Sequence, residues 1–250
     1  MPSNIILLQP NGPNGKLEHR EPPSPDLVES GERLVQNGYR WLNDTEHGMF
    51  MGAWDSTPAI MKSRPFPHHE FMLVLDGSVT IVEPGGHERV FHSGDCFVFP
   101  QGSIRQWKQT EYFRKYAVGL RDASWQQPAD PNSLRYVPIE LDASLERVPA
   151  LSKEAVESPL PIQHQRKWFA DPTGQMNVRV WDSTASQSKP EITRAHEWIH
   201  VLEGSVTLTE TAGAEHHFKR GDTFIVKLGT IYSWKCPGYF RAIHCTLQPD

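Results

Sequence analysis

A run of hydrophobic residues that is interrupted by a single turn occurs twice in the chain. Residues 69–80 read HEFMLVLDGSVT, and residues 196–207 read HEWIHVLEGSVT. Each run starts with a His-Glu pair, continues through apolar residues to an acidic residue followed by glycine, and resumes with Ser-Val-Thr. Two apolar, β-branched runs on either side of an acid-Gly pair are typical of a β-hairpin. We therefore predict one hairpin at each place.

The similarity between the two halves of the chain extends well beyond these runs. Residues 54–120 align with residues 181–247 without a gap at a constant offset of 127, and 28 of the 67 paired positions are identical. Turn glycines, apolar strand residues and tryptophans account for half of the identities. A repeat of this length indicates a duplicated domain rather than a solenoid. We expect the two segments to superpose strand for strand.

The remaining pattern predicts an all-β chain with two domains. Short apolar stretches alternate with turns rich in Gly, Pro and Asn along the sequence. The stretches 4–8 and 134–141 are predicted to be the matching first strands of the two halves. The predicted parts are an N-terminal domain at 1–123, a linker at 124–133 and a C-terminal domain at 134–250.

Each half resembles a cupin, which is a small jelly-roll β-barrel, and the whole chain resembles a bicupin. The first cupin motif has the form G-x5-H-x-H-x3/4-E-x6-G, and residues 70–77 and 197–204 match its second half. The second motif has the form G-x5-P-x-G-x2-H. Residues 94–102 match its first half, whereas the second repeat has Lys227 in place of the proline. The local sequence around the glutamate is most similar to that of a group of small cupins, which includes ureidoglycine aminohydrolase and ethanolamine-utilisation proteins.

The resemblance also implies where a metal would bind, because metal-binding cupins gather three His and one Glu inside the barrel. In the first half, the three histidine positions hold Arg64, Phe66 and Arg105, and only Glu70 is in place. The set is broken, so we do not expect a standard metal centre here. A nearby cation favours the charged form of a carboxylate. We expect Glu70 to be ionised and paired with at least one of the two arginines, in a cup that favours anions.

In the second half the same positions hold Glu191, Thr193 and Tyr232, and Glu197 is in place. Two carboxylates at close range repel, so one of them should bind a proton, a cationic ligand or a metal ion. Glu191 and Glu197, with His196 as a third ligand, are the candidate set for a divalent Mn, Mg or Zn ion in the C-terminal barrel. An amine is the alternative occupant.

Histidines next to the duplicated glutamates are further candidates. His68 lies two residues before Glu70, so on a strand it shares the face of that glutamate. His69 and His196 should point the other way, where packing at the barrel end or a hydrogen bond to a loop is the alternative to ligand binding. Residues 196–200 also fit H-E-x-x-H, but that zinc motif works only on a helix, and this segment is predicted to be a strand.

The duplicated glutamates and tryptophans each allow two interpretations. Glu70 and Glu197 are the candidate catalytic residues, acting as acid, base or ligand. The alternative is a structural carboxylate that is held by a tryptophan N–H or by backbone donors. Trp107 and Trp234 lie two residues past the last histidine position of the motif. They either form the wall of a ligand pocket or fill the barrel.

Composition restricts the classes of partner. The 250 residues carry a formal net charge of −5, which gives no electrostatic basis for binding nucleic acid. Three cysteines without C-x-x-C spacing argue against a disulfide framework. No run of 18 apolar residues and no basic signal region is seen, so we expect a cytoplasmic protein with no membrane contact. Because a bicupin mimics a cupin dimer within one chain, we expect a monomer or homodimer.

Two functions are consistent with these features. The first is a cupin that binds a small polar metabolite inside the barrel and has degenerate metal-ligand positions. The second is an enzyme of small nitrogenous or carboxylic metabolite turnover, similar to ureidoglycine aminohydrolase, with metal assistance in the C-terminal barrel. A storage protein is disfavoured, because the chain has no amide-rich tract.

Overall fold

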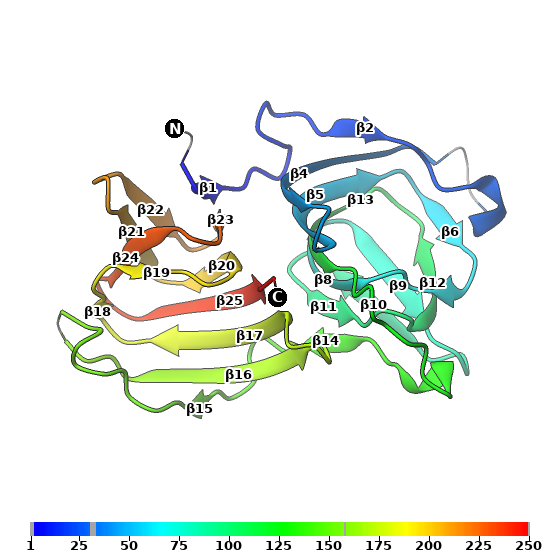
Figure 1. Ribbon diagram of the computed structural model, residues 1–250. Coiled ribbons are helices and arrows are strands. Elements are labelled where there is room, and N and C mark those ends of the chain that lie inside the picture. Colours follow the sequence, from blue (N-terminus) through cyan, green and yellow to red (C-terminus); the bar gives the residue numbers. More distant parts are fainter. Residues whose placement is uncertain (1–2, 31–33, 158, 250) are drawn as a thin grey trace. The chain divides into compact units, whose positions relative to one another are not determined.

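The computed structural model describes residues 3–30, 34–157 and 159–249, and nearly every element in these ranges is a β-strand (Figure 1). The helical elements among them are two 3-10 turns, Pro25–Leu27 and Pro131–Ser133. No helix in the described ranges is long and apolar enough to cross a membrane. The chain divides into two compact units, which confirms the predicted all-β fold of two domains.

The first unit, here called the N-terminal barrel, consists of residues 9–140. It contains two antiparallel sheets. One sheet has the order β14 (Val137–Ile139), β11 (Cys96–Phe99), β8 (His69–Asp76), β13 (Phe113–Leu120), β5 (Met49–Ser56), β4 (Gln36–Asp44) and β2 (Glu18–Arg20). The other has the order β10 (Glu88–His92), β9 (Ser78–Val82), β12 (Ile104–Gln109), β6 (Ala59–Met61) and β3 (Val28–Ser30), with β7 (Arg64–Pro65) also paired to β12.

The second unit, here called the C-terminal barrel, consists of residues 1–8 and 141–250. Its larger sheet has the order β1 (Ile5–Leu7), β23 (Thr223–Val226), β20 (His196–Glu203), β25 (Phe240–Leu247), β17 (Met176–Ser183), β16 (Gln163–Ala170) and β15 (Glu146–Arg147). The smaller has the order β18 (Ser186–Gln187), β24 (Ile231–Cys236), β21 (Ser205–Glu210) and β22 (Glu215–Lys219), with β19 (Glu191–Ile192) beside β24. The repeat-equivalent strands follow the same order in both units, as the alignment predicts.

The two predicted first strands exist, but each belongs to the barrel of the other half. Strand β1 pairs with β23, and β14 pairs with β11. The expected domain boundaries at 1–123 and 134–250 therefore differ from the compact units at both of these strands. Ile5 and Ile139 are buried in their adopted barrels, which removes apolar surface from water and covers an open sheet edge. Because duplication makes the two edges alike, the sequence does not indicate which edge each strand joins.

The predicted hairpins are wrong in one respect, because their two strands do not pair with each other. Strand β8 pairs with β11 and β13, whereas β9 pairs with β10 and β12, so the turn between them carries the chain from one sheet to the other. Only Gly77 separates the two strands, and its φ is 73°. A Cβ atom on Gly77 would lie 2.0 Å from the carbonyl oxygen of Tyr112, so glycine is required at this corner.

Several residues that the repeats share stabilise the barrels rather than form a site. The Tyr112 hydroxyl donates a hydrogen bond of 2.9 Å to Asp55, and the Tyr239 hydroxyl donates one of 3.0 Å to Asp182. Both residues of this contact are among the identities between the repeats, and the contact has the same form in both barrels. Between the sheets of the N-terminal barrel, the core contains Met72, Val74, Val79, Ile81, Phe91, Phe97, Phe99 and Phe113.

Candidate functional site

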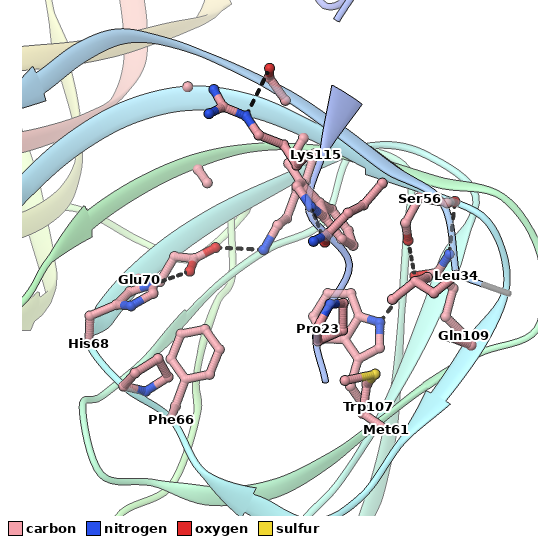
Figure 2. Close-up of a pocket in the computed structure, with 18 of the residues that line it drawn as sticks. Pro23, Leu34, Ser56, Met61, Phe66, His68, Glu70, Trp107, Gln109 and Lys115 are labelled. Atoms are coloured by element: carbon pink, nitrogen blue, oxygen red, sulfur yellow. Dashed lines mark hydrogen bonds and ion pairs between the residues drawn. The ribbon is translucent and has the colours of Figure 1, made fainter. Parts of the chain in front are cut away.

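The N-terminal barrel encloses a cavity of about 510 Å³, which lies among residues of both sheets (Figure 2). Its apolar lining includes the aromatic side chains of Phe50, Trp54, Phe66 and Trp107. Six lining residues carry a positive charge, against two that carry a negative charge, Glu21 and Glu70. The cationic residues are Arg20, Arg40, Lys62, Arg64, Arg105 and Lys115. The cavity is therefore an aromatic cup with an excess of positive charge.

Glu70 from β8 lies in this cavity and is buried. One carboxylate oxygen is 2.5 Å from Nζ of Lys115 on the neighbouring strand β13, and the other is 2.5 Å from Nε2 of His68 (Figure 2). Burial would raise the pKa of the Glu70 carboxyl, but the Lys115 ammonium and the His68 ring lower it to about 2. Glu70 is thus ionised at neutral pH, as expected, but its ion-pair partner is a lysine and not an arginine.

Sequence reasoning missed Lys115. The lysine lies 5.2 Å from the ring centroids of both Trp54 and Trp107, so two indole faces surround the ammonium that Glu70 binds. The Trp107 indole N–H donates to Gln109 at 3.1 Å and does not hold the glutamate. Trp107 does line the cavity, as one of its two interpretations required. The available signal was a lysine inside the otherwise mostly apolar stretch 113–120.

The side chain of Arg105 is buried next to the same cavity. Its guanidinium carbon lies 3.6 Å from the ring centroids of both Phe66 and Phe99. Nη1 donates to the carbonyl and hydroxyl oxygens of Ser103, at 2.7 and 3.1 Å. Within the described residues, Nε and Nη2 have no hydrogen-bond acceptor. Arg64 also lines the cavity, so both predicted arginines are at the site although neither contacts Glu70 directly.

The C-terminal barrel has a smaller pocket of about 270 Å³ around Glu197. The Thr193 and Tyr232 hydroxyls donate to the two carboxylate oxygens at 2.6 and 2.9 Å. Burial raises the pKa of Glu197, and these two hydroxyls only partly oppose that effect. Five residues that the motif indicated in this half are brought together in its lining, namely Glu191, Thr193, Glu197, Tyr232 and Trp234. The other lining residues are Ser188, Ile192 and Arg194.

Two polar side chains behind Glu197 were also missed. Nε and Nη2 of Arg179 donate to Nδ1 of His244 at 3.2 and 2.9 Å, and Nε2 of His244 lies 3.8 Å from Glu197. Burial lowers the pKa of His244 well below its usual value, and the charge of Arg179 lowers it further, so the imidazole is neutral. The first repeat has Gly52 and Ala117 at the equivalent positions, so duplication gave no signal for this pair.

The two histidines next to the glutamates turn away from them. Nδ1 of His69 accepts a hydrogen bond of 3.0 Å from the backbone N–H of Gln101, and Nδ1 of His196 accepts one of 3.1 Å from that of Leu228. Each ring thus anchors a loop at the end of its barrel. The expected metal set of Glu191, Glu197 and His196 is not brought together, because adjacent residues of a strand face opposite sides.

The donor sets do not fit the metal centre that a cupin fold implies. In the N-terminal barrel, Lys115 and His68 already engage both oxygens of Glu70, and the buried cation of Arg105 would repel a metal ion. In the ranges that the structure describes, no three His, Cys, Asp or Glu side chains are close enough to share a metal ion. Neither glutamate thus belongs to a set of metal ligands among the described residues.

Comparison with known proteins identifies the fold family. The sequence model of the EutQ-like cupin domain family matches the chain twice, at residues 45–117 and 170–241. No curated protein matches the sequence. A solved structure of a protein of unknown function from Pseudomonas syringae pv. tomato superposes with a TM-score of 0.76 at 20% identity, over 98% of this chain and 100% of that chain.

Two further solved structures show the breadth of the fold. The putative glyoxylate-induced protein from Pseudomonas aeruginosa has a TM-score of 0.61 at 12% identity, over 96% of this chain and 88% of that one. A variant of salicylate 1,2-dioxygenase from Pseudoaminobacter salicylatoxidans has a TM-score of 0.53 at 13% identity, over 84% of this chain and 76% of that one. At such low identities the likeness shows a shared fold and carries no function with it.

Proposed function

This chain belongs to the EutQ-like cupin domain family, and we propose that its N-terminal barrel binds a small organic anion. The expected ligand is a carboxylate with an apolar or aromatic body. The observation that carries the proposal is Arg105. Nε and Nη2 of this buried guanidinium have no acceptor among the described residues, so they are free to donate to a ligand in the adjoining cavity. The N–H groups of a guanidinium lie in one plane, and a pair of them matches the geometry of the two oxygens of a carboxylate.

The sign of the ligand charge follows from how the site is already paired. Of the two carboxylates among the described lining residues, Glu21 is exposed and Glu70 is buried, and Lys115 compensates Glu70 at 2.5 Å. Arg105 has no such partner among the described residues. A ligand carboxylate would supply the missing negative charge, while Trp54 and Phe66 would contact its apolar part. A volume of about 510 Å³ suits a small molecule, since ligand sites commonly measure roughly 300–1,000 Å³.

The test compares acids with neutral molecules of the same shape. We would measure binding of propionate, benzoate and related acids by isothermal titration calorimetry, each beside its amide. The acids should bind, and their amides should bind at least about tenfold more weakly, because a charged hydrogen-bonded pair contributes roughly 1.5–3 kcal/mol. Arg105→Met should lose the preference for acids. Arg194→Met is the matched control, because Arg194 lines the other pocket.

Two results would contradict the proposal. One is equal affinity for an acid and its amide in the wild-type protein. The other is unchanged acid binding in a folded Arg105→Met variant. Circular dichroism and Arg105→Lys, which keeps the charge, separate loss of the site from loss of the fold.

A second candidate function, acid–base catalysis on a small carboxylic or nitrogenous metabolite, is favoured by the contact between His68 and Glu70. A histidine that is oriented by a buried carboxylate and lines a cavity has the arrangement of a general base. Exchange of the α-protons of a bound acid with deuterated solvent, followed by NMR, would detect this role. His68→Phe should abolish the exchange but retain binding. If the wild-type protein shows no exchange, the catalytic function is contradicted and the binding function is unaffected.

A further inference from the structure

Among the differences between the two barrels, one concerns the residue that pairs with the duplicated glutamate. In the N-terminal barrel the ammonium of Lys115 contacts Glu70 and lies between Trp54 and Trp107. The C-terminal barrel keeps the glutamate and both tryptophans as Glu197, Trp181 and Trp234, but the residue equivalent to the lysine is Ala242. The centroids of these two indole rings lie 5.6 Å apart, close to the 6.3 Å of the N-terminal pair. The second barrel thus keeps the acid and the aromatic rings but not the ammonium.

The charge of Glu197 is correspondingly left without a direct partner. Its oxygens accept from the hydroxyls of Thr193 and Tyr232, which are neutral donors. The nearest ring nitrogen is Nε2 of His244 at 3.8 Å, which has no hydrogen-bond partner in the described part of the chain. Arg179 lies behind that imidazole and does not form an ion pair with the glutamate in the ranges described. The side chain of Glu197 is 14% exposed, and a largely buried carboxylate without a contacting cation is an unfavourable arrangement that a cationic ligand would relieve.

We propose that the C-terminal barrel binds a small primary ammonium ligand at Glu197, in the role that the side chain of Lys115 has at Glu70. The pocket of about 270 Å³ leads to Glu197 and has room for a short alkyl tail. Glu191 adds a second carboxylate to its lining, and Trp234 offers an aromatic face to a cation. The site is independent of the anion site in the other barrel, and either can fail without the other.

A primary ammonium fits this site better than other cations do. Its three N–H groups can donate to Glu197 and to the Tyr232 oxygen together, whereas a quaternary ammonium has no donors. A second positive charge on the ligand would be disfavoured by Arg194, which lines the same pocket. The ligand class is therefore a short primary alkylamine with one positive charge.

The experiment uses n-butylammonium, which reproduces the lysine side chain, with n-butanol as the uncharged control. Binding to the full chain is measured by NMR titration. We expect one equivalent of n-butylammonium to bind, n-butanol to bind at least tenfold more weakly, and Glu197→Gln to weaken n-butylammonium at least tenfold. Ala242→Lys should abolish binding, because the tethered ammonium would occupy the site. Arg105→Met should bind the amine like the wild-type protein.

Several outcomes would overturn the proposal. Equal binding of n-butylammonium and n-butanol would show that charge is not recognised. Unchanged binding in Glu197→Gln would place the amine elsewhere, and so would full binding in a folded Ala242→Lys variant. If Ala242→Lys does not fold, Glu197→Gln still decides the matter. The analogy itself is tested with Lys115→Ala, whose melting temperature n-butylammonium should raise more than that of the wild-type protein; no such rescue would contradict it.

Discussion

Replacing Glu70 by glutamine tests whether its ion pair with Lys115 stabilises the N-terminal barrel. The substitution keeps the shape of the side chain but removes its charge, which leaves the lysine ammonium buried and uncompensated. Breaking a buried pair by removing one partner typically costs about 3–5 kcal/mol. The pKa of Glu70 gives a similar figure. A pKa lowered from 4.5 to about 2 corresponds to roughly 3 kcal/mol for the Lys115 and His68 contacts together, because each tenfold change in a protonation equilibrium is worth about 1.4 kcal/mol.

The free energy of unfolding would be measured by urea denaturation at neutral pH, with fluorescence and circular dichroism compared for a two-state transition. We expect Glu70→Gln to lose about 3 kcal/mol. A double-mutant cycle with Lys115→Met isolates the pair, because the second substitution should cost much less once the first is present. A loss below about 1 kcal/mol, or simple additivity of the two substitutions, would refute the reasoning.

The same pair predicts a pH dependence of stability. The pKa of Glu70 is lower in the folded than in the unfolded protein. Its contribution to the free energy of unfolding is therefore fully present above about pH 4.5 and is lost as the pH falls toward 2. The difference in stability between the wild-type protein and Glu70→Gln should therefore shrink over this interval. A difference that stays constant from pH 6 down to about pH 2.5 would contradict the assignment.

Further predictions concern the other glutamate, the exchanged strand and the corner between the sheets. Because burial raises the pKa of Glu197, Glu197→Gln should gain stability relative to the wild-type protein as the pH rises above 4.5; pH-dependent urea denaturation measures the sign of this change. Deleting residues 1–8 should increase hydrogen exchange in β23 of the C-terminal barrel and leave β11 protected, the reverse of what contiguous domains would give. Gly77→Ala should lower the free energy of unfolding by more than about 1 kcal/mol, whereas Gly85→Ala, also at positive φ but in open space, should cost less.

The sequence alone determined the features that depend on local pattern or on repetition. Alternating apolar runs, turn glycines and a constant offset predicted an all-β chain of two domains with equivalent strands, and the order of the strands in each sheet confirms this. The barrel form was implied by the resemblance to cupins. The family motif also drew attention to Glu70, Arg105 and Trp107, and all three line one cavity in the structure, while their roles in binding stay predictions. Strand periodicity is a local property of the sequence, and it fixes which side chains of a strand point inward.

Only the tertiary structure decided which groups meet across the barrel. Lys115 contacts Glu70 because β13 lies beside β8, although the two residues are far apart in sequence. The lysine has no counterpart in the second repeat, where Ala242 takes its place and Arg179 and His244 stand behind Glu197 instead. Likewise, two equivalent sheet edges gave no local reason for β1 to join β23. Pairings between distant strands depend on the packing of the whole barrel, and a linear pattern of residues does not contain that information.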